Sequence, residues 1–228
     1  HEVIIRGGLG NQIFCLFYAY KIHLKYKTKV AFNLTNYLIS NKTNRFFILD
    51  SLYPPLKDEF NYKSNFISKF LYIFIRIVDK LFVKSNTSYL PGDNPFFLSY
   101  WPNRYIHSGH FQKIIGSELD NKCFELIKEK MKPYIIRKKI NYLAIHLRRG
   151  DYLKEEHSIH GIIPEQYFLE EAKKKLSLHS YEGITIFSDS PNLIKFDIFK
   201  TLHNNVKLDK GGEPLEVFIR MANHKGLI

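Results

Sequence analysis

Between residues 142 and 228, short apolar runs alternate with longer segments of helical character, and this alternation restricts the fold more than any other feature of the sequence. The runs are rich in apolar and β-branched residues, as strands are, and prolines stand where two of the intervening segments begin. We expect strands at residues 142–147, 183–187, 206–208 and 225–228. We expect helices at residues 164–178, at 190–199 and from 214 onward. Strands that alternate with helices predict a parallel sheet wound with helices, an α/β fold.

The N-terminal part of the chain begins with a similar pattern. We expect a strand, a tight glycine turn, an apolar helix and a second strand at residues 2–6, 7–11, 12–26 and 29–33. Two more helices are expected at residues 66–83 and 119–132, the second ending before Pro133 because proline cannot continue a helix. Residues 34–65 have no sustained period, and the composition of residues 84–103 indicates a loop. The chain is therefore expected to form two lobes, at residues 1–136 and 137–228.

The strand at residues 142–147 runs directly into the motif His-Leu-Arg-Arg-Gly-Asp. Ligands of α/β proteins bind beyond the carboxyl ends of parallel strands, and two guanidinium groups there suit an anion with several oxygens. Successive residues of a strand point to opposite sides. We therefore expect His146 and Arg148 to line one cleft, and Arg149 to pair with Asp151 or with scaffold groups.

A second motif, Gly-Gly-Leu-Gly-Asn-Gln, lies between the first strand and the first helix. Its glycines allow the backbone to approach a ligand, and the helix start directs unpaired N–H groups toward it. The motif is not a dinucleotide fingerprint, because Ile13 stands where the third glycine belongs, and it lacks the Lys-Ser/Thr pair of a P-loop. The amides of Asn11 and Gln12 would reach a sugar or phosphate oxygen.

Composition limits the classes of partner and the compartment. The net charge of +12 and the pI near 9.5 indicate attraction to polyanions, anionic lipid surfaces or phosphorylated small molecules. Two cysteines far apart in sequence support neither a disulfide framework nor a zinc cluster, which favours a reducing cytoplasm. Residues 66–83 are apolar but are interrupted by four charged residues, so they suit a packed helix or a membrane-surface helix rather than a spanning one.

The pairing of GGLGNQ with HLRRGDY resembles the inverting α1,2-fucosyltransferases and, more loosely, the α1,6- and protein O-fucosyltransferases. The segments YIHSGHFQ (105–112), His160-Gly161 and IFSD (186–189) agree with it. The resemblance extends from residue 2 to 228, although residues 34–100 contribute little. It implies a GT-B-like pair of Rossmann-type lobes that uses GDP-fucose as donor substrate without a metal. The sequence contains no Asp-x-Asp motif for a metal–diphosphate bridge.

The resemblance also implies roles for particular residues. The catalytic residues would be Arg148, His146 and Asn11, and the donor would be bound by Gly8, Gly10, Asn11, Gln12, Arg148, Arg149, Asp151, Ser188 and Asp189. Arg148 would neutralise the departing β-phosphate in a cleft shared with Gly10 and Asn11. Asp189 would accept hydrogen bonds from guanine, although Ser190 stands where the family commonly has a second acidic residue.

The family continues beyond the last strand with a segment of the type Asn-Ser-Ser-x-Ser-Trp-Trp, whereas this sequence ends at Ile228. We therefore expect the C-terminal lobe to be incomplete. No general base stands out, and His160, Glu213 and Asp151 are the candidates.

The leading hypothesis is the transfer of L-fucose from GDP-fucose to the 2-hydroxyl of a galactose-type acceptor, with inversion, in the synthesis of a surface glycan such as O-antigen. The acceptor would be a lipid-linked or lipopolysaccharide glycan, and the protein would be cytoplasmic, with peripheral contact at the inner membrane face as an open alternative. Another fucosyl linkage and a non-catalytic GDP-sugar-binding protein also stay open. Nucleic-acid binding is disfavoured because the lysines are dispersed and no aromatic–basic motif is present.

Overall fold

The computed structural model describes residues 1–39, 46–63, 106–107, 116–136, 138–150 and 163–228. The chain divides into two compact units, His1–Lys132 (unit 1) and Pro133–Ile228 (unit 2). The predicted helix at 66–83 and the predicted loop at 84–103 lie outside the described residues.

The described residues of unit 1 contain a parallel sheet whose strands lie in the order β3-β2-β1-β4. The strands are β1 (Glu2–Ile4), β2 (Ala31–Asn33), β3 (Asn61–Lys63) and β4 (Ile106–His107). In this register Val3 lies opposite Phe32 on one side and His107 on the other. The sequence did not predict β3 and β4, because these short strands are defined by their pairing with β2 and β1, far away in the sequence.

Helices lie around this sheet: α1 (Leu9–Tyr26), α2 (Thr35–Ile39), α3 (Leu49–Leu52), α4 (Leu56–Glu59) and α6 (Glu118–Ile135). The helix α1 begins at Leu9 with Gly8 as its N-cap, so the turn predicted at residues 7–11 is shorter than expected. The prediction that α6 ends before Pro133 is wrong. Proline removes a single N–H from the helix, and the chain completes most of one further turn beyond it.

The carboxylate of Glu59 connects three segments of unit 1. The hydroxyl groups of Tyr20 and Tyr53 donate hydrogen bonds to it, and the Lys130 ammonium donates another over 2.8 Å. These residues come from α1, from the end of α3 and from α6. Burial alone would raise the pKa of Glu59, but Lys130 and the two hydroxyl groups outweigh burial and lower it. The ionised carboxylate therefore stabilises the fold.

We expect Glu59→Gln to lower the free energy of unfolding at pH 7 by about 1–3 kcal/mol, the range for a hydrogen-bonded charged group. A carboxylate with a lowered pKa contributes stability above its unfolded pKa, about 4.3, and loses it as the pH falls through the folded value. The difference in the free energy of unfolding between wild type and variant should therefore shrink as the pH falls below about 5. Urea unfolding at several pH values measures this. Glu118→Gln, an exposed carboxylate paired with Lys122, is the control and should change little.

Unit 2 contains a second parallel sheet, in the order β7-β6-β5-β8. Its strands are β5 (Ile140–Leu147), β6 (Gly183–Ser188), β7 (Val206–Leu208) and β8 (His224–Leu227). His146 pairs with Phe187 and Leu147 with Ser188, so β5 and β6 end side by side. The two parallel sheets confirm the predicted α/β class and are consistent with Rossmann-like lobes.

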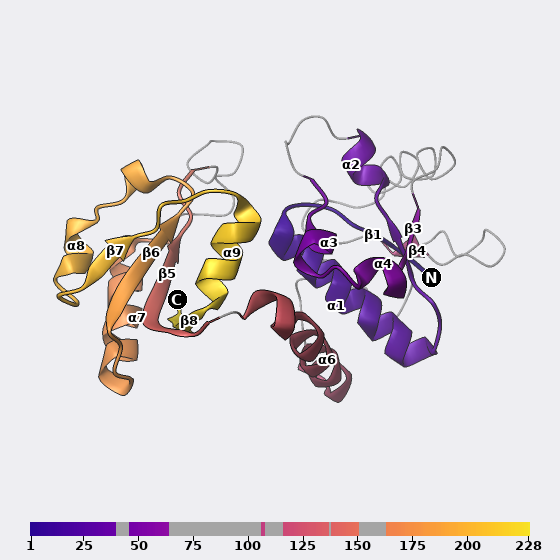
Figure 1. Ribbon diagram of the computed structural model, residues 1–228, viewed down its shortest axis with the longest axis horizontal. Coiled ribbons are helices and arrows are strands. Elements are labelled where there is room, and N and C mark those ends of the chain that lie inside the picture. Colours follow the sequence, from indigo (N-terminus) through magenta and orange to yellow (C-terminus); the bar gives the residue numbers. More distant parts are fainter. Residues whose placement is uncertain (40–45, 64–105, 108–115, 137, 151–162) are drawn as a thin grey trace. The chain divides into compact units, whose positions relative to one another are not determined.

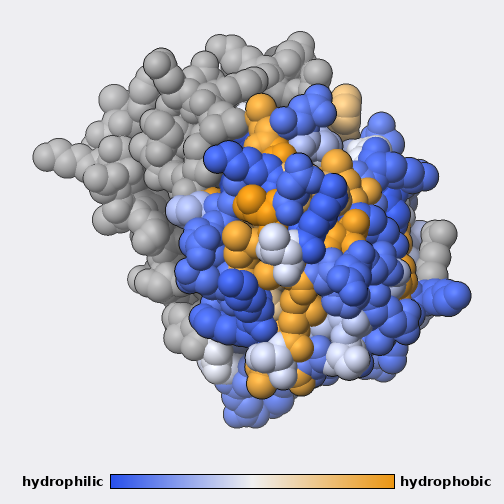
Figure 2. Space-filling view, turned by 90° about the vertical axis from the view of Figure 1, so that its left-hand side faces the viewer, coloured by the Kyte–Doolittle hydropathy of each residue, from blue (hydrophilic) through white to orange (hydrophobic). Residues whose placement is uncertain are grey.

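The helices of unit 2 are α7 (Glu165–Leu178), α8 (Asp197–Lys200) and α9 (Pro214–Ala222). Figure 1 shows α7 and α9 on opposite sides of the sheet. The helix predicted at residues 190–199 is wrong: the segment holds a 3-10 turn at Pro191–Leu193 and then the short α8. Hydrophilic side chains cover most of the face shown in Figure 2, with hydrophobic ones in a broken band between them.

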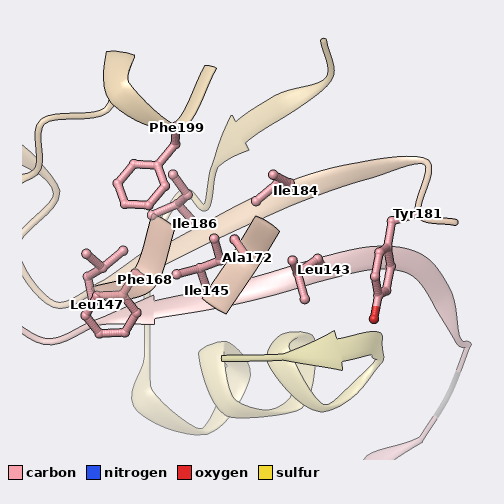
Figure 3. Close-up of a cluster of buried hydrophobic side chains, with 9 residues drawn as sticks. All are labelled: Leu143, Ile145, Leu147, Phe168, Ala172, Tyr181, Ile184, Ile186 and Phe199. Atoms are coloured by element: carbon pink, nitrogen blue, oxygen red, sulfur yellow. The ribbon is translucent and has the colours of Figure 1, made fainter. Parts of the chain in front are cut away.

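The core of unit 2 lies between β5, β6 and α7 (Figure 3). It contains Leu143, Ile145, Leu147, Phe168, Ala172, Tyr181, Ile184, Ile186 and Phe199. Every second residue of β5 enters this core, as the period of two requires. Each large aliphatic side chain buried here contributes about 1.5–3 kcal/mol, so the end of β5 is firmly placed.

Candidate functional site

The two sheets have the same strand order, and each motif follows the first strand of its unit. β1 lies between β2 and β4, and β5 lies between β6 and β8. The strand order therefore reverses beside β1 and beside β5. Ligands of open α/β sheets bind at such a reversal, beyond the carboxyl ends of the strands. This topology makes the glycine corner (Gly7–Gln12) and the arginine loop (Arg148–Gly150) the candidate sites of their units.

The arginine loop is held by the carboxylate of Asp189, which follows β6. The backbone N–H of Arg149 donates to Asp189 Oδ1 over 2.8 Å, and that of Gly150 donates to Oδ1 and Oδ2 over 3.1 and 3.2 Å. A Cβ at Gly150 would lie 2.6 Å from Ser190 Oγ and 3.0 Å from Asp189 Oδ2, so a side chain there would displace these two side chains. Asp189 therefore fixes the path of the backbone that carries both arginines.

The two arginines point to different environments. Arg148 is exposed, whereas Arg149 is only 6% exposed. The Arg149 guanidinium donates to the Arg148 carbonyl over 3.3 Å and lies 6.0 Å from the ring centre of Phe168 in α7. Arg149 therefore contacts scaffold groups, and its predicted contact with the donor stays a prediction. Arg148 is the guanidinium of this loop that a ligand can reach.

His146 lies two residues before Arg148 and is half-buried. Burial lowers its pKa; the negative charge of Asp189 opposes this shift, and the positive charge of Arg148 adds to it. Because the net shift is downward from 6.5, the imidazole is neutral at pH 7. His146 can donate or accept a hydrogen bond, but the positive charge at the end of β5 comes from Arg148.

Removing the Asp189 carboxylate should release the arginine loop without unfolding unit 2. In Asp189→Ala we expect the backbone amides of Arg149 and Gly150 to exchange with solvent faster by about one to two orders of magnitude. Asp189→Asn keeps one acceptor oxygen and should show a smaller effect. Hydrogen exchange followed by NMR measures both, with Asp197→Ala, an exposed carboxylate paired with Lys200, as control. Unchanged exchange in Asp189→Ala would show that the carboxylate does not hold the loop.

A third loop, after β7, was not recognised from the sequence. The Arg220 guanidinium donates to both oxygens of Asp209 over 2.9 and 2.7 Å, and to the Gly211 carbonyl over 2.7 Å. The Gly211 N–H donates back to Asp209 over 2.9 Å. These bonds tie the loop to α9 at the same end of the sheet as the arginine loop. The sequence indicated this loop only through Asp209, an acidic residue directly after the strand β7.

Gln12 holds the glycine corner in unit 1. Its Nε2 donates to the carbonyls of Gly7 and Phe46 over 3.2 and 2.8 Å, and its Oε1 accepts from the N–H groups of Ile48 and Leu49 over 3.0 and 3.1 Å. These four bonds use both donors and both lone pairs of the amide. The side chain is fully buried. Gln12 therefore positions the corner, and its predicted contact with the donor stays a prediction.

The remaining corner residues leave room for a ligand. Gly7 has a φ of 78°, and a Cβ there would lie 2.4 Å from Asn11 Nδ2, so a side chain is excluded. A Cβ at Gly8 or Gly10 would meet nothing within 4 Å. Asn11 is half-buried beside Gly7. The predicted contacts of Gly8, Gly10 and Asn11 with substrate stay predictions.

Gln12→Met should destabilise unit 1 although the side-chain volume is nearly kept. The variant leaves the N–H groups of Ile48 and Leu49 unpaired, at about 1–3 kcal/mol for each buried group. We expect the free energy of unfolding, measured in urea, to fall by at least about 2 kcal/mol. Asn121→Leu, an amide on the exposed side of α6, is the control and should stay close to wild type. Equal stability of Gln12→Met and wild type would contradict the positioning role.

The remaining predicted residues lie outside the described ranges or are not part of the two loops. Asp151, His160, Gly161 and His110 lie outside the described residues. His107 is buried: its Nδ1 lies 3.1 Å from the Tyr18 hydroxyl, and burial lowers its pKa to about 4. Glu213 is exposed at the start of α9. The prediction that Arg148 and Asn11 share a cleft concerns two different units and stays a prediction.

Within the described ranges, no three His, Cys, Asp or Glu side chains lie close enough together to hold a metal ion. A metal-independent reaction stays a prediction. No helix in the described part of the chain has the length and apolar character needed to cross a membrane.

Comparisons with known proteins give weak similarity to two solved structures. The first is the fucosyltransferase NodZ from Bradyrhizobium, with 13% identity over 97% of this chain and 82% of that chain, and a TM-score of 0.36. The second is the NodZ alpha-1,6-fucosyltransferase soaked with GDP-fucose, with 10% identity over 97% and 81% of the two chains, and a TM-score of 0.35. Similarity at this level does not establish a shared fold. No family model and no curated protein match the sequence.

Proposed function

We propose that this protein is a fucosyltransferase that moves L-fucose from GDP-fucose to the 2-hydroxyl of a galactose-type acceptor, with inversion. The observation that carries the proposal is the exposed Arg148 at the strand-order reversal of unit 2, on a loop fixed by Asp189. The motifs GGLGNQ and HLRRGD, which resemble those of the inverting α1,2-fucosyltransferases, name the donor and the linkage.

The reaction places its main electrostatic demand on the leaving group. The acceptor oxygen forms a bond to C1 of fucose while the bond from C1 to the β-phosphate oxygen breaks, and GDP departs with the electron pair. Negative charge therefore grows on the diphosphate, and the sugar gains oxocarbenium character. A preorganised cation at that point lowers the barrier by several kcal/mol, as donors in oxyanion holes do. Arg148 supplies this charge because guanidinium does not deprotonate.

Neighbouring residues have supporting roles in this proposal. Asp189 restrains the backbone on which Arg148 sits, which reduces the reorganisation needed when charge develops. Its carboxylate is exposed and keeps lone pairs beyond those used by the loop, so the predicted contact with guanine stays open to it. Neutral His146 would donate or accept a hydrogen bond to the bound nucleotide. The proton of the acceptor hydroxyl would go to one of the candidate bases, Glu213, His160 or Asp151.

The glycine corner of unit 1 is proposed to contact the donor through Gly8, Gly10 and Asn11, and to bind the acceptor beside the donor. There the Cβ directions of Gly8 and Gly10 are open, and Asn11 provides an amide for a sugar hydroxyl. A lipid-linked glycan of the O-antigen type, used at the inner face of the cytoplasmic membrane, suits the net charge of +12.

Arg148→Ala should abolish transfer while the protein stays folded, because the side chain is exposed. We expect turnover to fall by about 100-fold or more, as with the loss of one transition-state donor. The assay uses GDP-fucose and a panel of galactosides without divalent metal, follows GDP release and determines the linkage by NMR. Lys173→Ala, which removes one positive charge from the exposed side of α7, is the control and should keep wild-type turnover.

Turnover of Arg148→Ala near the wild-type rate would contradict the mechanism. Transfer to a position other than the 2-hydroxyl would correct the linkage, and GDP-fucose binding without turnover would favour the non-catalytic alternative. Oligonucleotide binding that weakens with salt and does not change when GDP is added would favour a nucleic-acid-binding function.

A further inference from the structure

Phe46 is an aromatic residue that unit 1 leaves in solvent, with 72% of the residue exposed. Single exposed apolar residues are common on protein surfaces, so exposure alone indicates nothing. Two further properties separate Phe46 from such residues: its backbone is firmly held, and it lies beside the glycine corner.

The backbone from the Phe46 carbonyl to Ile48 is held by the Gln12 side chain. This carbonyl accepts a hydrogen bond from Gln12 Nε2 over 2.8 Å, and Gln12 Oε1 binds the N–H of Ile48. The next ring, Phe47, packs edge-on against Tyr62 with ring centres 5.4 Å apart. Phe47 is half-buried against Tyr62, whereas Phe46 is exposed to solvent. An exposed ring on a fixed backbone loses little conformational entropy when a ligand covers it.

The side-chain amide of Gln12 also connects Phe46 to the glycine corner. Gln12 Nε2 donates both to the Phe46 carbonyl and to the Gly7 carbonyl, so the two backbone oxygens lie on either side of one nitrogen atom. The Tyr37 hydroxyl also donates to the Gly7 carbonyl, over 2.8 Å. The backbone of this exposed aromatic residue thus lies beside Gly7, the first residue of the glycine corner, which also contains the open positions Gly8 and Gly10 and the amide of Asn11.

We propose that Phe46 is the platform on which the pyranose ring of the acceptor sugar stacks. One face of a galactose-type ring presents several C–H groups, whose partial positive charge suits the negative face of an aromatic ring. The hydroxyl groups at the rim of the sugar then meet the amide and backbone groups of the glycine corner. An apolar platform beside a few polar groups is the usual composition of a small-molecule site. This inference deepens the proposed function, on which it rests, by naming the acceptor subsite.

The experiment compares Phe46→Ala, Phe46→Tyr and Leu24→Ala in the full chain. Leu24 is 38% exposed near the far end of α1 and serves as the matched control. Binding of methyl β-galactopyranoside is measured by saturation-transfer NMR with and without GDP, and the acceptor KM and the rate of GDP release are measured in parallel. We expect Phe46→Ala to weaken galactoside binding and raise the acceptor KM about three- to tenfold. Phe46→Tyr should restore both, because the stacking face is kept.

The KM for GDP-fucose and the acceptor-independent release of GDP should stay unchanged in Phe46→Ala, which separates the platform from a general loss of structure. Galactoside binding that is equal in Phe46→Ala and wild type overturns the inference, as does a wild-type protein that binds no galactoside with or without GDP. A wild type without fucosyl transfer that binds galactoside through Phe46 would refute the proposed function and support the platform.

Discussion

A polar side chain that binds backbone groups next to the loop after the first strand is the interaction on which both candidate sites depend. In unit 1 the amide of Gln12 binds four backbone groups around the glycine corner, and in unit 2 the carboxylate of Asp189 binds two N–H groups of the arginine loop. A loop at the end of a parallel strand leaves its own backbone groups without ladder partners, so a side chain must supply them. The residues that shape these loops, Gln12 and Asp189, therefore do so through backbone groups, whatever side chains would touch a ligand.

The repeated strand order explains why two dissimilar motifs occupy equivalent places. In each sheet the first strand lies in the interior and the fourth strand is added on its far side. Helices that cover opposite faces diverge at this reversal, and the loop after the first strand is left accessible. In unit 2 the tightly packed core under β5 supports that loop (Figure 3). The glycine corner and the arginine loop thus occupy the same topological position in their two sheets, although their sequences differ.

The sequence predicted the strands β1, β2 and β5–β8 and the helices α1, α6, α7 and α9, because apolar period, prolines and glycines act locally. It missed β3 and β4, whose identity depends on pairing with distant strands. It also assigned Gln12 to ligand binding and did not indicate its positioning role. The bonds of Gln12 to Ile48 and Leu49 join residues more than thirty positions apart, and no local pattern encodes them. The alternation along β5 indicated that Arg149 faces away from Arg148, but its position over Phe168 depends on how α7 packs.

The charges around the arginine loop explain how a carboxylate can order a loop that is proposed to bind an anion. A carboxylate next to a bound phosphate would normally repel it. Asp189 directs its oxygens at two backbone N–H groups, and the buried Arg149 guanidinium belongs to the same loop. With His146 neutral, the described part of the loop carries two positive charges and one negative charge. Arg148 is the exposed one of the two arginines, so in the proposed mechanism its guanidinium can approach a diphosphate although a carboxylate orders the loop.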